Sequence, residues 1–289
     1  MRRLLVFCFS LLLAMVINLT NAGIILTSPA WADEDSNIDF VFSVFPTQES
    51  WDEVFSIAST DPACTGSDIL SYDHFLEAVD YRPDFLTNPT QEENMRELAA
   101  FLAHVSLETN GAGPGQYNGG LCFAEEVDCR DAYCDYCTGM GGGLDESPAC
   151  LYGYYGRGAL QITNPDNYLR TSNEVFGDER LWYNPDLMLE GTTAWDASLA
   201  FWLTREGGLI DSKTTVPGLT TCHEAIVTYN DFGKTVEVIN GNLECENPDP
   251  DFIEKTRKRG EYYKTYLQDF SDKLGLFYEE PDNLTCAGD

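Results

Sequence analysis

The sequence predicts a mainly α-helical domain whose long loops are tied by disulfides. Three observations support this prediction: apolar residues recur at helical spacing in several segments, no stretch is rich in strand-forming alternation, and nine cysteines follow residue 32. The chain of 289 residues is long enough for one domain with a sizeable core. Its high aromatic content excludes a disordered chain.

Residues 1–32 are predicted to be a secretory signal peptide. Two arginines precede a mostly apolar run over residues 4–19, and Ala30-Trp31-Ala32 has the small-x-small form that signal peptidase accepts. The alternative is a membrane anchor, which is disfavoured by the polar Asn18 inside the run and by the lack of a second long apolar run. We therefore expect a secreted, extracellular protein in which disulfides form.

The chain is strongly acidic. Its formal net charge is −31, and removal of residues 1–32, which contain two arginines and no acidic residue, makes it −33. Such a surface repels phosphate backbones and anionic lipids, so we expect neither a nucleic-acid nor a membrane partner. A neutral sugar polymer meets no such repulsion. We also expect a monomer.

The first strong helix is predicted near residues 91–108. Before it, residues 33–60 form an acidic lead-in that ends in a first, short helix around residues 51–57. Thr90 and Glu93 have the spacing of a capping box, which marks a helix start. One apolar stripe then follows at helical spacing: Met95, Leu98, Leu102 and Val105.

The rest of the chain alternates loops with helices. Residues 111–153 are rich in Gly and Cys and are predicted to be a disulfide-tied loop region, and a short strand fits residues 154–163. Helices are expected at residues 192–205, 222–229 and 252–274. The last of them has a predicted buried side formed by Tyr262, Tyr263, Tyr266, Leu267 and Phe270.

Two acidic positions suit the hydrolysis of a glycosidic bond, which needs one protonated and one ionised carboxyl group. Glu108 ends the apolar helix, where the negative end of the helix dipole and partial burial both disfavour an ionised carboxylate. Glu125 and Glu126 follow Cys122 in a loop that a disulfide can hold against this helix end. The alternative is that these two loop residues are ordinary surface acids.

Two other segments place polar side chains among apolar ones. Residues 154–163 contain Arg157, Gln161 and Thr163, which can contact a carboxylate or a sugar, or which belong to a structural strand with a salt bridge. Residues 238–245 contain Asn240, whose amide suits an acetamido group. The alternative there is a simple turn, because Asn-Gly is a strong turn pair.

Other kinds of site have weaker support. His104 lies four residues before Glu108 on the same helix face, and a histidine satisfied within the protein is the simpler interpretation than a metal ligand. Cys129, Cys134 and Cys137 are spaced closely enough for zinc, but no histidine lies near them and the compartment is oxidising. No nucleophile elbow or dinucleotide-binding motif is present. We therefore expect no metal and no cofactor.

Together, these segments resemble the family 19 glycoside hydrolases, the plant-type endochitinases. Residues 101–109 are similar to the helix that carries the family's catalytic acid, residues 154–161 to its Tyr-Tyr-Gly-Arg-Gly signature, and residues 238–245 to its Asn-Gly-Gly-x-Glu-Cys stretch. Residues 71–75 and 184–187 also match, and the order is that of the family. The resemblance covers about residues 50–286. It implies a lysozyme-like, two-lobed helical domain with a substrate cleft, which we place at residues 61–289.

The resemblance also implies roles for particular residues. Glu108 falls at the general acid, Glu126 at the general base, and Thr163 at a serine that helps to hold the attacking water. The substrate-contact positions are Tyr155, Gln161, Asn167 and Asn240. A charged network under the acid is expected from Arg157, Glu244 and Arg259. The family inverts the anomeric centre, which requires the two carboxyl groups to lie roughly 6.5–9.5 Å apart.

The family's disulfides map onto this sequence in part. The implied pairs are Cys64–Cys122 and Cys245–Cys286, and a third bond joins Cys150 to Cys134 or Cys137. The remaining two of Cys129, Cys134 and Cys137 are then free to pair, which leaves Cys222 as the odd thiol. The sequence departs from the family at Leu107, where the family has His, and at residues 111–113, which lack its Trp.

The function implied is endo-acting hydrolysis of chitin or its N-acetylglucosamine oligosaccharides. One alternative is a hydrolase of peptidoglycan, which shares β-1,4-linked N-acetylglucosamine units. Another is a non-catalytic, sugar-binding defence protein on the same scaffold. Both predicted catalytic carboxyl groups are present, which favours an enzyme.

Overall fold

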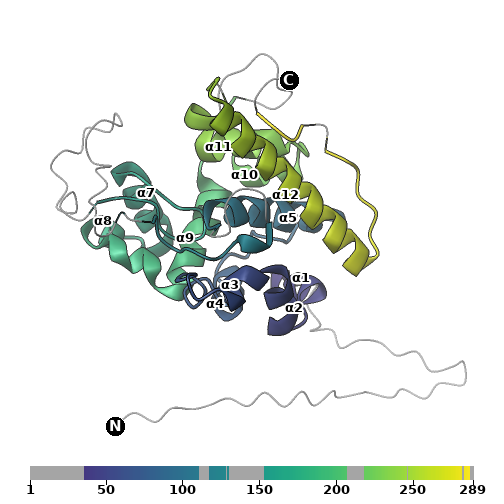
Figure 1. Cartoon of the computed structure of the whole chain (residues 1–289), viewed down its shortest axis with the longest axis horizontal. Coiled ribbons are helices and arrows are strands. Elements are labelled where there is room, and N and C mark those ends of the chain that lie inside the picture. Colours follow the sequence, from purple (N-terminus) through teal and green to yellow (C-terminus); the bar gives the residue numbers. More distant parts are fainter. Residues whose placement is uncertain are drawn as a thin grey trace, which may run out of the picture. The chain divides into compact units, whose positions relative to one another are not determined.

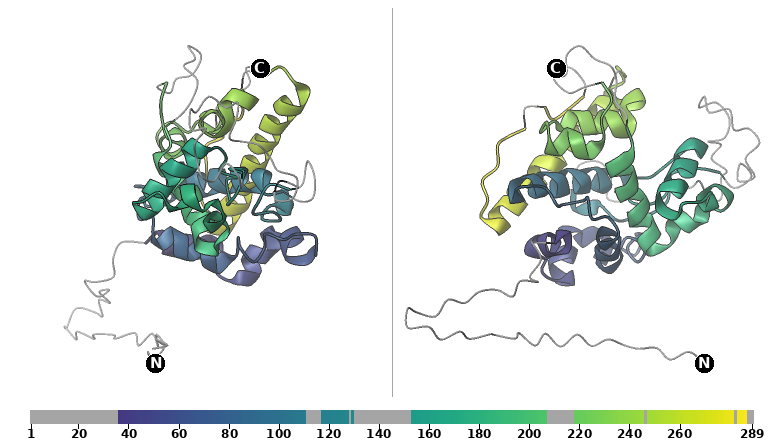
Figure 2. Two further views of the ribbon diagram at one scale, coloured as in Figure 1. Left: turned by 90° about the vertical axis from the view of Figure 1, so that its left-hand side faces the viewer. Right: turned by 180° about the vertical axis from the view of Figure 1, so that it is seen from behind.

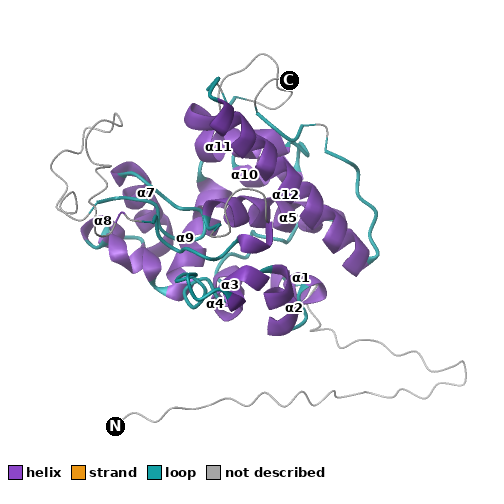
Figure 3. Cartoon of the chain, in the orientation of Figure 1, coloured by secondary structure: helices purple, strands orange, loops and turns teal. Residues whose placement is uncertain are grey.

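The described part of the chain is built from helices joined by loops, and it contains isolated β-bridges in place of strands (Figure 3). This computed structural model describes residues 36–110, 117–127, 129, 153–206, 218–245, 247–281 and 283–286, without the side chains of residues 117 and 242. All of them belong to one unit, residues 35–289. The predicted signal peptide and the predicted disulfide residues Cys134, Cys137 and Cys150 lie outside the described residues.

Four short helices form the N-terminal part of this unit. They are α1 (Asn37–Val44), α2 (Gln48–Val54), α3 (Ser56–Thr60) and α4 (Tyr72–Asp80). The N-cap hydroxyls of α1, α2 and α4 each accept a hydrogen bond from the third amide of the helix, which is why these helices start where they do. The sequence predicted only one helix here, because the apolar stripes of α1 and α4 are short.

The long helix α5 (Gln91–Glu108) starts as predicted, with Thr90 as its N-cap and a complete capping box with Glu93. The sequence indicated one buried stripe, but almost every residue of α5 after its first turn is buried, including Glu97 and His104. A helix buried on all sides lies inside the protein, so α5 is the central helix of the fold. It packs against α12 more extensively than any other described pair of helices does.

A second group of helices follows the cysteine-rich region. It consists of α7 (Pro165–Phe176), α8 (Arg180–Tyr183), the 3-10 helix η3 (Pro185–Leu189) and α9 (Gly191–Thr204). A short 3-10 turn, η1 (Tyr117–Gly119), precedes that region. The predicted short strand at residues 154–163 is not formed: Arg157 makes two isolated bridges, to Glu125 and to Ile162, inside an otherwise irregular segment.

The last group contains α10 (Cys222–Val227), α11 (Phe232–Glu244) and α12 (Pro250–Leu274). Helix α12 starts two residues before its predicted start because Asp249 caps it and Pro250 occupies its first turn. All five predicted core residues of α12 are buried. Helix α11 runs through the segment that contains Asn240, with a kink at that residue, so the simple turn considered there is not formed.

The buried apolar side chains form two clusters, which correspond to the two predicted lobes. The larger cluster surrounds α5 and contains Trp51 and Trp195, so helix α2 of the lead-in belongs to this core. The smaller cluster lies among α7, α8, η3 and α9 and contains Tyr154 and Tyr168. Figures 1 and 2 show α7–α9 gathered on one side of α5 and α10–α12 on another. None of the described helices combines the length and the apolar character that crossing a bilayer requires.

Two predicted disulfides are confirmed, Cys64–Cys122 and Cys245–Cys286. The first joins the segment after α3 to the loop after α5, and the second joins the end of α11 to the C-terminal segment. Cys129 is also disulfide-bonded, so its sulfur is not a thiolate that could bind zinc. Cys222 is the free thiol among the described cysteines, as predicted, and it is buried.

Candidate active site

A cleft of about 350 Å³ brings together residues that lie far apart in the sequence. Six of the predicted site residues line it: Glu108, Glu126, Gln161, Thr163, Asn167 and Asn240. They come from the end of α5, the loop after Cys122, the segment before α7, the first turn of α7 and the kink of α11. The cleft therefore holds both carboxyl groups that the sequence analysis singled out.

Glu108 is the last residue of α5, and its side chain is 13% exposed. One of its carboxylate oxygens accepts a hydrogen bond from Nη2 of Arg259 on α12. Lys255 Nζ, one turn earlier on α12, lies 4.0 Å from the other oxygen. Two cations of α12 thus face the carboxylate that ends α5, and they offset the negative end of the α5 dipole.

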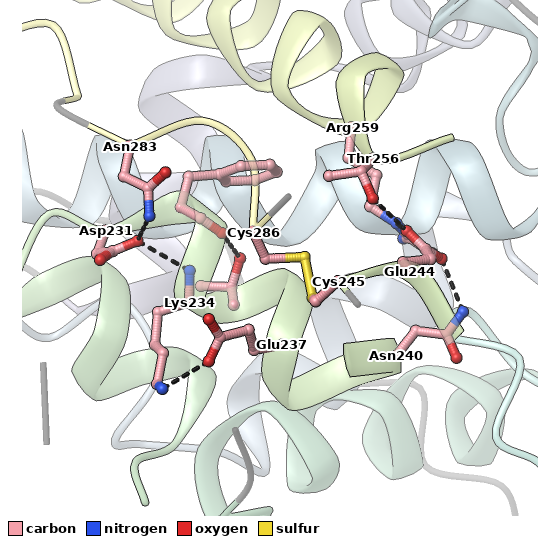
Figure 4. Close-up of a disulfide and its surroundings, with 12 residues drawn as sticks. Asp231, Lys234, Glu237, Asn240, Glu244, Cys245, Thr256, Arg259, Asn283 and Cys286 are labelled. Atoms are coloured by element: carbon pink, nitrogen blue, oxygen red, sulfur yellow. Dashed lines mark hydrogen bonds and ion pairs between the residues drawn. A yellow bond between two sulfur atoms is a disulfide. The ribbon is translucent and has the colours of Figure 1, made fainter. Parts of the chain in front are cut away.

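Glu244, the last residue of α11, also accepts hydrogen bonds from Arg259 (Figure 4). Nε of Arg259 donates to Oε2 of Glu244 at 2.9 Å and Nη2 donates to Oε1 at 2.8 Å. Burial by itself would raise the pKa of Glu244, but the charge and hydrogen bonds of Arg259, with smaller contributions from Lys255 and Asn240, outweigh it and lower the pKa to about 2. Glu244 is therefore an ionised partner that neutralises the buried guanidinium.

Asn240 owes its position to the kink in α11. Its backbone has φ −147° and ψ 28°, outside the helical region. The amide Nδ2 donates to Oε1 of Glu244 at 2.7 Å, so the kink and the charged pair support each other (Figure 4). The residue lines the cleft as well, so one Asn connects the cleft wall to the network beneath it.

Glu126 is held by a short piece of backbone pairing. Its amide donates to the carbonyl oxygen of Gly156 at 2.8 Å, and the amide of Gly156 donates to Oε2 of Glu126 at 3.1 Å. A Cβ on residue 156 would lie 2.8 Å from Oε1 of Gln161, so a larger residue there would displace the Gln161 side chain. The signature segment thereby fixes Glu126 at the cleft.

Thr163, Gln161 and Asn167 form one wall of the cleft and are linked by hydrogen bonds. The hydroxyl of Thr163 donates to the carbonyl oxygen of Gln161 at 2.8 Å, which leaves its lone pairs available as acceptors. Nδ2 of Asn167 donates to the carbonyl oxygen of Thr163 at 2.9 Å. Gln161 adopts φ 49°, a left-handed backbone conformation that is uncommon outside glycine and often marks functional sites.

Two predicted residues lie elsewhere. Arg157 is fully buried, but it pairs with Asp186 at 3.0 Å and donates to the hydroxyl of Tyr168 at 2.8 Å, both in the smaller lobe. It is therefore separate from the Arg259–Glu244 pair, and the predicted charged network contains Glu244 and Arg259 without it. Tyr155 is buried, and Cζ of Arg157 lies 3.6 Å from the centroid of its ring. Tyr155 is not among the residues that line the cleft.

The structure adds residues that the sequence analysis did not select. Lys255 lines the cleft with a side chain that is 36% exposed, and Phe201, Ile239 and Leu243 give the cleft an apolar portion. The available signal for Lys255 was its place four residues before Arg259, on the same face of a helix. Within the described residues, no group of three or more His, Cys, Asp or Glu side chains is arranged to hold a metal ion.

Comparison with known proteins identifies one family. The sequence pattern of the family described as Chitinase class I matches residues 46–286. Chitinase 3 of Oryza sativa subsp. japonica is 33% identical over 237 residues, which cover 78% of this chain and 68% of the relative. The acidic endochitinase pcht28 of Solanum chilense is 28% identical over 244 residues, which cover 83% of this chain and 84% of the relative.

Solved structures agree with this result. Chitinase C from Streptomyces griseus HUT6037 superposes with a TM-score of 0.59 at 28% identity, over 85% of this chain and 81% of that one. A family GH19, class IV chitinase from Zea mays superposes with a TM-score of 0.56 at 25% identity, over 83% of this chain and 96% of that one. The helical fold predicted from the resemblance is therefore confirmed.

Proposed function

The chain belongs to the class I chitinase family, glycoside hydrolase family 19, and from this premise we propose that it is a secreted endochitinase. It hydrolyses the β-1,4 linkages between N-acetylglucosamine units of chitin and inverts the anomeric carbon. The observation that carries the proposal is that Glu108 and Glu126, 18 residues apart on different elements, line one cleft. A pair of carboxyl groups across a cleft is the minimum that glycosidic hydrolysis requires.

Glu108 acts as the proton donor in this proposal. Arg259 contacts both Glu108 and the ionised Glu244, and Lys255 lies beside both carboxyl groups. In the proposed reaction Glu108 delivers a proton to the leaving oxygen. The rigid packing of α5 against α12 fixes the direction in which that proton is offered.

Glu126 acts as the general base and activates a water molecule on the opposite face of the sugar. Thr163 lies in the same cleft and has a hydroxyl oxygen whose proton is engaged elsewhere, so it accepts a hydrogen bond from that water. This arrangement leads to inversion, because water attacks the carbon from the side opposite the departing sugar.

Substrate is held by amides and apolar surface. Gln161, Asn167 and Asn240 offer donors and acceptors to hydroxyl and acetamido groups, and Ile239 and Leu243 offer apolar contacts to the sugar faces. The net charge of −31 suits an uncharged polymer. Secretion is supported by the two disulfides between described cysteines and by the predicted signal peptide. We expect the enzyme to act as a monomer.

The test is turnover of chitin hexamer by the wild type and by Glu108→Gln, Glu126→Gln and Glu125→Gln. Loss of the acid or the base should lower kcat by about 10²–10⁴-fold. Glu125→Gln is the matched control, because Glu125 neighbours Glu126 but does not line the cleft. It should stay within a few-fold of wild type. A near-wild-type kcat in Glu108→Gln would show that Glu108 is not the proton donor.

The anomeric form of the first products tests the stereochemistry. Inversion predicts that the new reducing end appears as the α-anomer, and β-anomer as the initial product would exclude an inverting reaction. A parallel incubation with bacterial cell walls tests peptidoglycan as the preferred substrate. Binding of chitin hexamer without any product would support the non-catalytic alternative.

A further inference from the structure

His104 is buried in α5, one turn before Glu108, and both of its ring nitrogens have partners. Nε2 lies 2.7 Å from Oγ1 of Thr235 on α11, and Nδ1 lies 3.1 Å from Nη1 of Arg259 on α12. The ring stacks on Phe232, with centroids 4.9 Å apart and planes inclined by 15°. The side chain therefore sits at the junction of three helices and touches the guanidinium that holds Glu108.

The hydrogen bonds around His104 allow one tautomer. The hydroxyl of Thr235 donates its only proton to the carbonyl oxygen of Phe232 at 2.7 Å, so it must accept from His104. The ring proton is consequently on Nε2, and Nδ1 presents a lone pair. Arginine can only donate, so this lone pair is what Nη1 of Arg259 requires.

The charges nearby keep the ring neutral. Burial, and then the positive charge of Arg259, lower the pKa of His104 well below its usual value, while Glu244 opposes this effect. The titratable and charged groups around His104 and Arg259 come from four helices: Glu108 on α5, Cys222 on α10, Glu244 on α11, and Lys255 and Arg259 on α12.

We propose that His104 is a positioning residue for the reaction: its neutral Nδ1 accepts from Arg259 and so fixes the guanidinium that orients Glu108. Glu244 occupies Nε and Nη2 of Arg259, and Glu108 occupies Nη2. His104 is the acceptor at Nη1. This inference rests on the proposed function, in which Glu108 is the proton donor.

A neutral acceptor is the appropriate partner at Nη1. A third carboxylate there would add a negative charge beside the catalytic acid and disfavour the ionised forms of Glu108 and Glu244. An apolar side chain would leave a buried guanidinium donor without an acceptor, and the guanidinium would turn toward another partner. A small misplacement of a group that orients a reacting atom lowers the rate strongly.

The experiment compares two variants of nearly equal size and shape, His104→Asn and His104→Leu. Both remove the ring and its bond to Thr235, but the Asn oxygen stands close to the place of Nδ1 and keeps an acceptor for Arg259. We expect His104→Leu to lower kcat on chitin hexamer by about 10- to 100-fold with KM within about twofold of wild type. His104→Asn should retain activity within about threefold of wild type.

The pH profile of kcat provides a second readout, which a merely structural role would not move. In His104→Leu the contact of Arg259 with Glu108 loosens, the acid keeps its proton to higher pH, and the alkaline limb shifts upward by about half a pH unit or more. In His104→Asn the limb should stay at its wild-type position.

Ser106→Ala is the matched control. Ser106 is buried on the same helix and also bonds α12, through the hydroxyl of Tyr266 at 2.7 Å, but it does not contact Arg259. This variant should lose stability without a change in kcat or in the pH profile. Equal kcat values and equal pH profiles for His104→Asn and His104→Leu would overturn the inference. A decrease of kcat in Ser106→Ala equal to that in His104→Leu would overturn it as well. A wild-type protein that cleaves no chitin would instead overturn the proposed function.

Discussion

Arg259 brings the charged residues of the site into one balanced group. Its guanidinium is fully buried and contacts both Glu244 and Glu108, and Lys255 lies beside both carboxylates. Two cations therefore face two carboxylates. Buried charges persist only when they are paired and hydrogen-bonded, so removal of Glu244 leaves the buried guanidinium of Arg259 without its main partner. This coupling explains why the pKa of Arg259 is raised and that of Glu244 is lowered, despite the opposing effect of burial in each case.

The lowered pKa of Glu244 predicts how stability depends on pH. Its folded-state pKa of about 2 lies below the ordinary value of 4.5, so its contribution is complete above about pH 4.5 and is lost as the pH falls toward 2. The shift corresponds to about 3 kcal/mol at neutral pH. Urea unfolding should find Glu244→Gln less stable than wild type by about this amount at pH 7, with a difference that shrinks at pH 3.

Glu254 supplies the control for this measurement. A side-chain hydrogen bond from Arg257 lowers its pKa to about 2 as well, but Glu254 is exposed to solvent. Solvent screens such a surface pair, so Glu254→Gln should follow the wild-type pH dependence. A Glu244→Gln difference that stays constant between pH 7 and pH 3 would contradict the role given to this carboxylate.

At the level of single residues, the sequence located the carboxyl groups better than it located their partners. Glu108 stands out because an acidic residue at the end of an apolar helix is unusual, and the resemblance selects Glu126 from the neighbouring pair Glu125 and Glu126. The resemblance predicts Arg157 beside Glu244, but a sequence motif does not reveal which acidic residue its arginine contacts, and the structure pairs Arg157 with Asp186. Lys255 was not selected because, in the sequence, it is one of several charges on the polar side of a helix.

Helix α5 is the element on which the site depends. It carries His104 and Glu108 at its C-terminal end, 18 residues from its capped start, and it is buried along most of its length. The capping box at Thr90 and the site at Glu108 are thus at opposite ends of one rigid helix. Stability and catalysis can be perturbed separately at these two ends.

Thr90→Ala tests this separation. Loss of an N-cap hydroxyl costs about 1 kcal/mol of the free energy of unfolding, because an amide of the first turn loses its acceptor. We expect this loss in chemical denaturation, together with an unchanged kcat. Thr265→Ala, on the exposed side of α12, should change stability by less than about 0.5 kcal/mol. A kcat that falls in parallel with stability in Thr90→Ala would show that the two ends are not independent.

The elements that the sequence predicted well are those with a long apolar pattern, such as α5, α9 and α12, and in α5 and α12 a side-chain N-cap adds to this signal. Helix α11 was missed because Asn240-Gly241 is a turn signal in isolation. Its helix continues past the kink because Asn240 bonds to Glu244 and Glu244 bonds to Arg259, a contact made across 15 residues of sequence. Residues 154–163 do not form a strand, because the described residues contain no neighbouring strand with which their backbone could form a continuous ladder.

The whole molecule carries far more negative than positive charge, with 48 acidic against 17 basic side chains. The repulsion among these charges acts against the folded state, and dissolved ions screen it. The free energy of unfolding should therefore rise when salt is added at low concentration.

A comparison of two denaturants isolates this effect. At about 0.2 M, guanidinium chloride both denatures and screens charge, while urea only denatures, although guanidinium is the stronger denaturant per mole. We expect guanidinium chloride at that concentration to lower Tm less than urea does, or to raise it. A larger decrease in guanidinium chloride than in urea would exclude charge repulsion as a significant term in the stability of this protein.

Helix α9 is shared by the two clusters of buried side chains. Trp195, Leu199 and Trp202 point into the larger cluster, Ala197 belongs to the smaller one, and Phe201 packs against both and lines the cleft. As lineages of this chain diverge, each cluster can change on its own except along this helix, because a substitution that displaces α9 in one cluster also displaces the side chains that α9 places in the other. We therefore expect descendants to preserve the sizes of these side chains, while the surfaces of both lobes diversify freely.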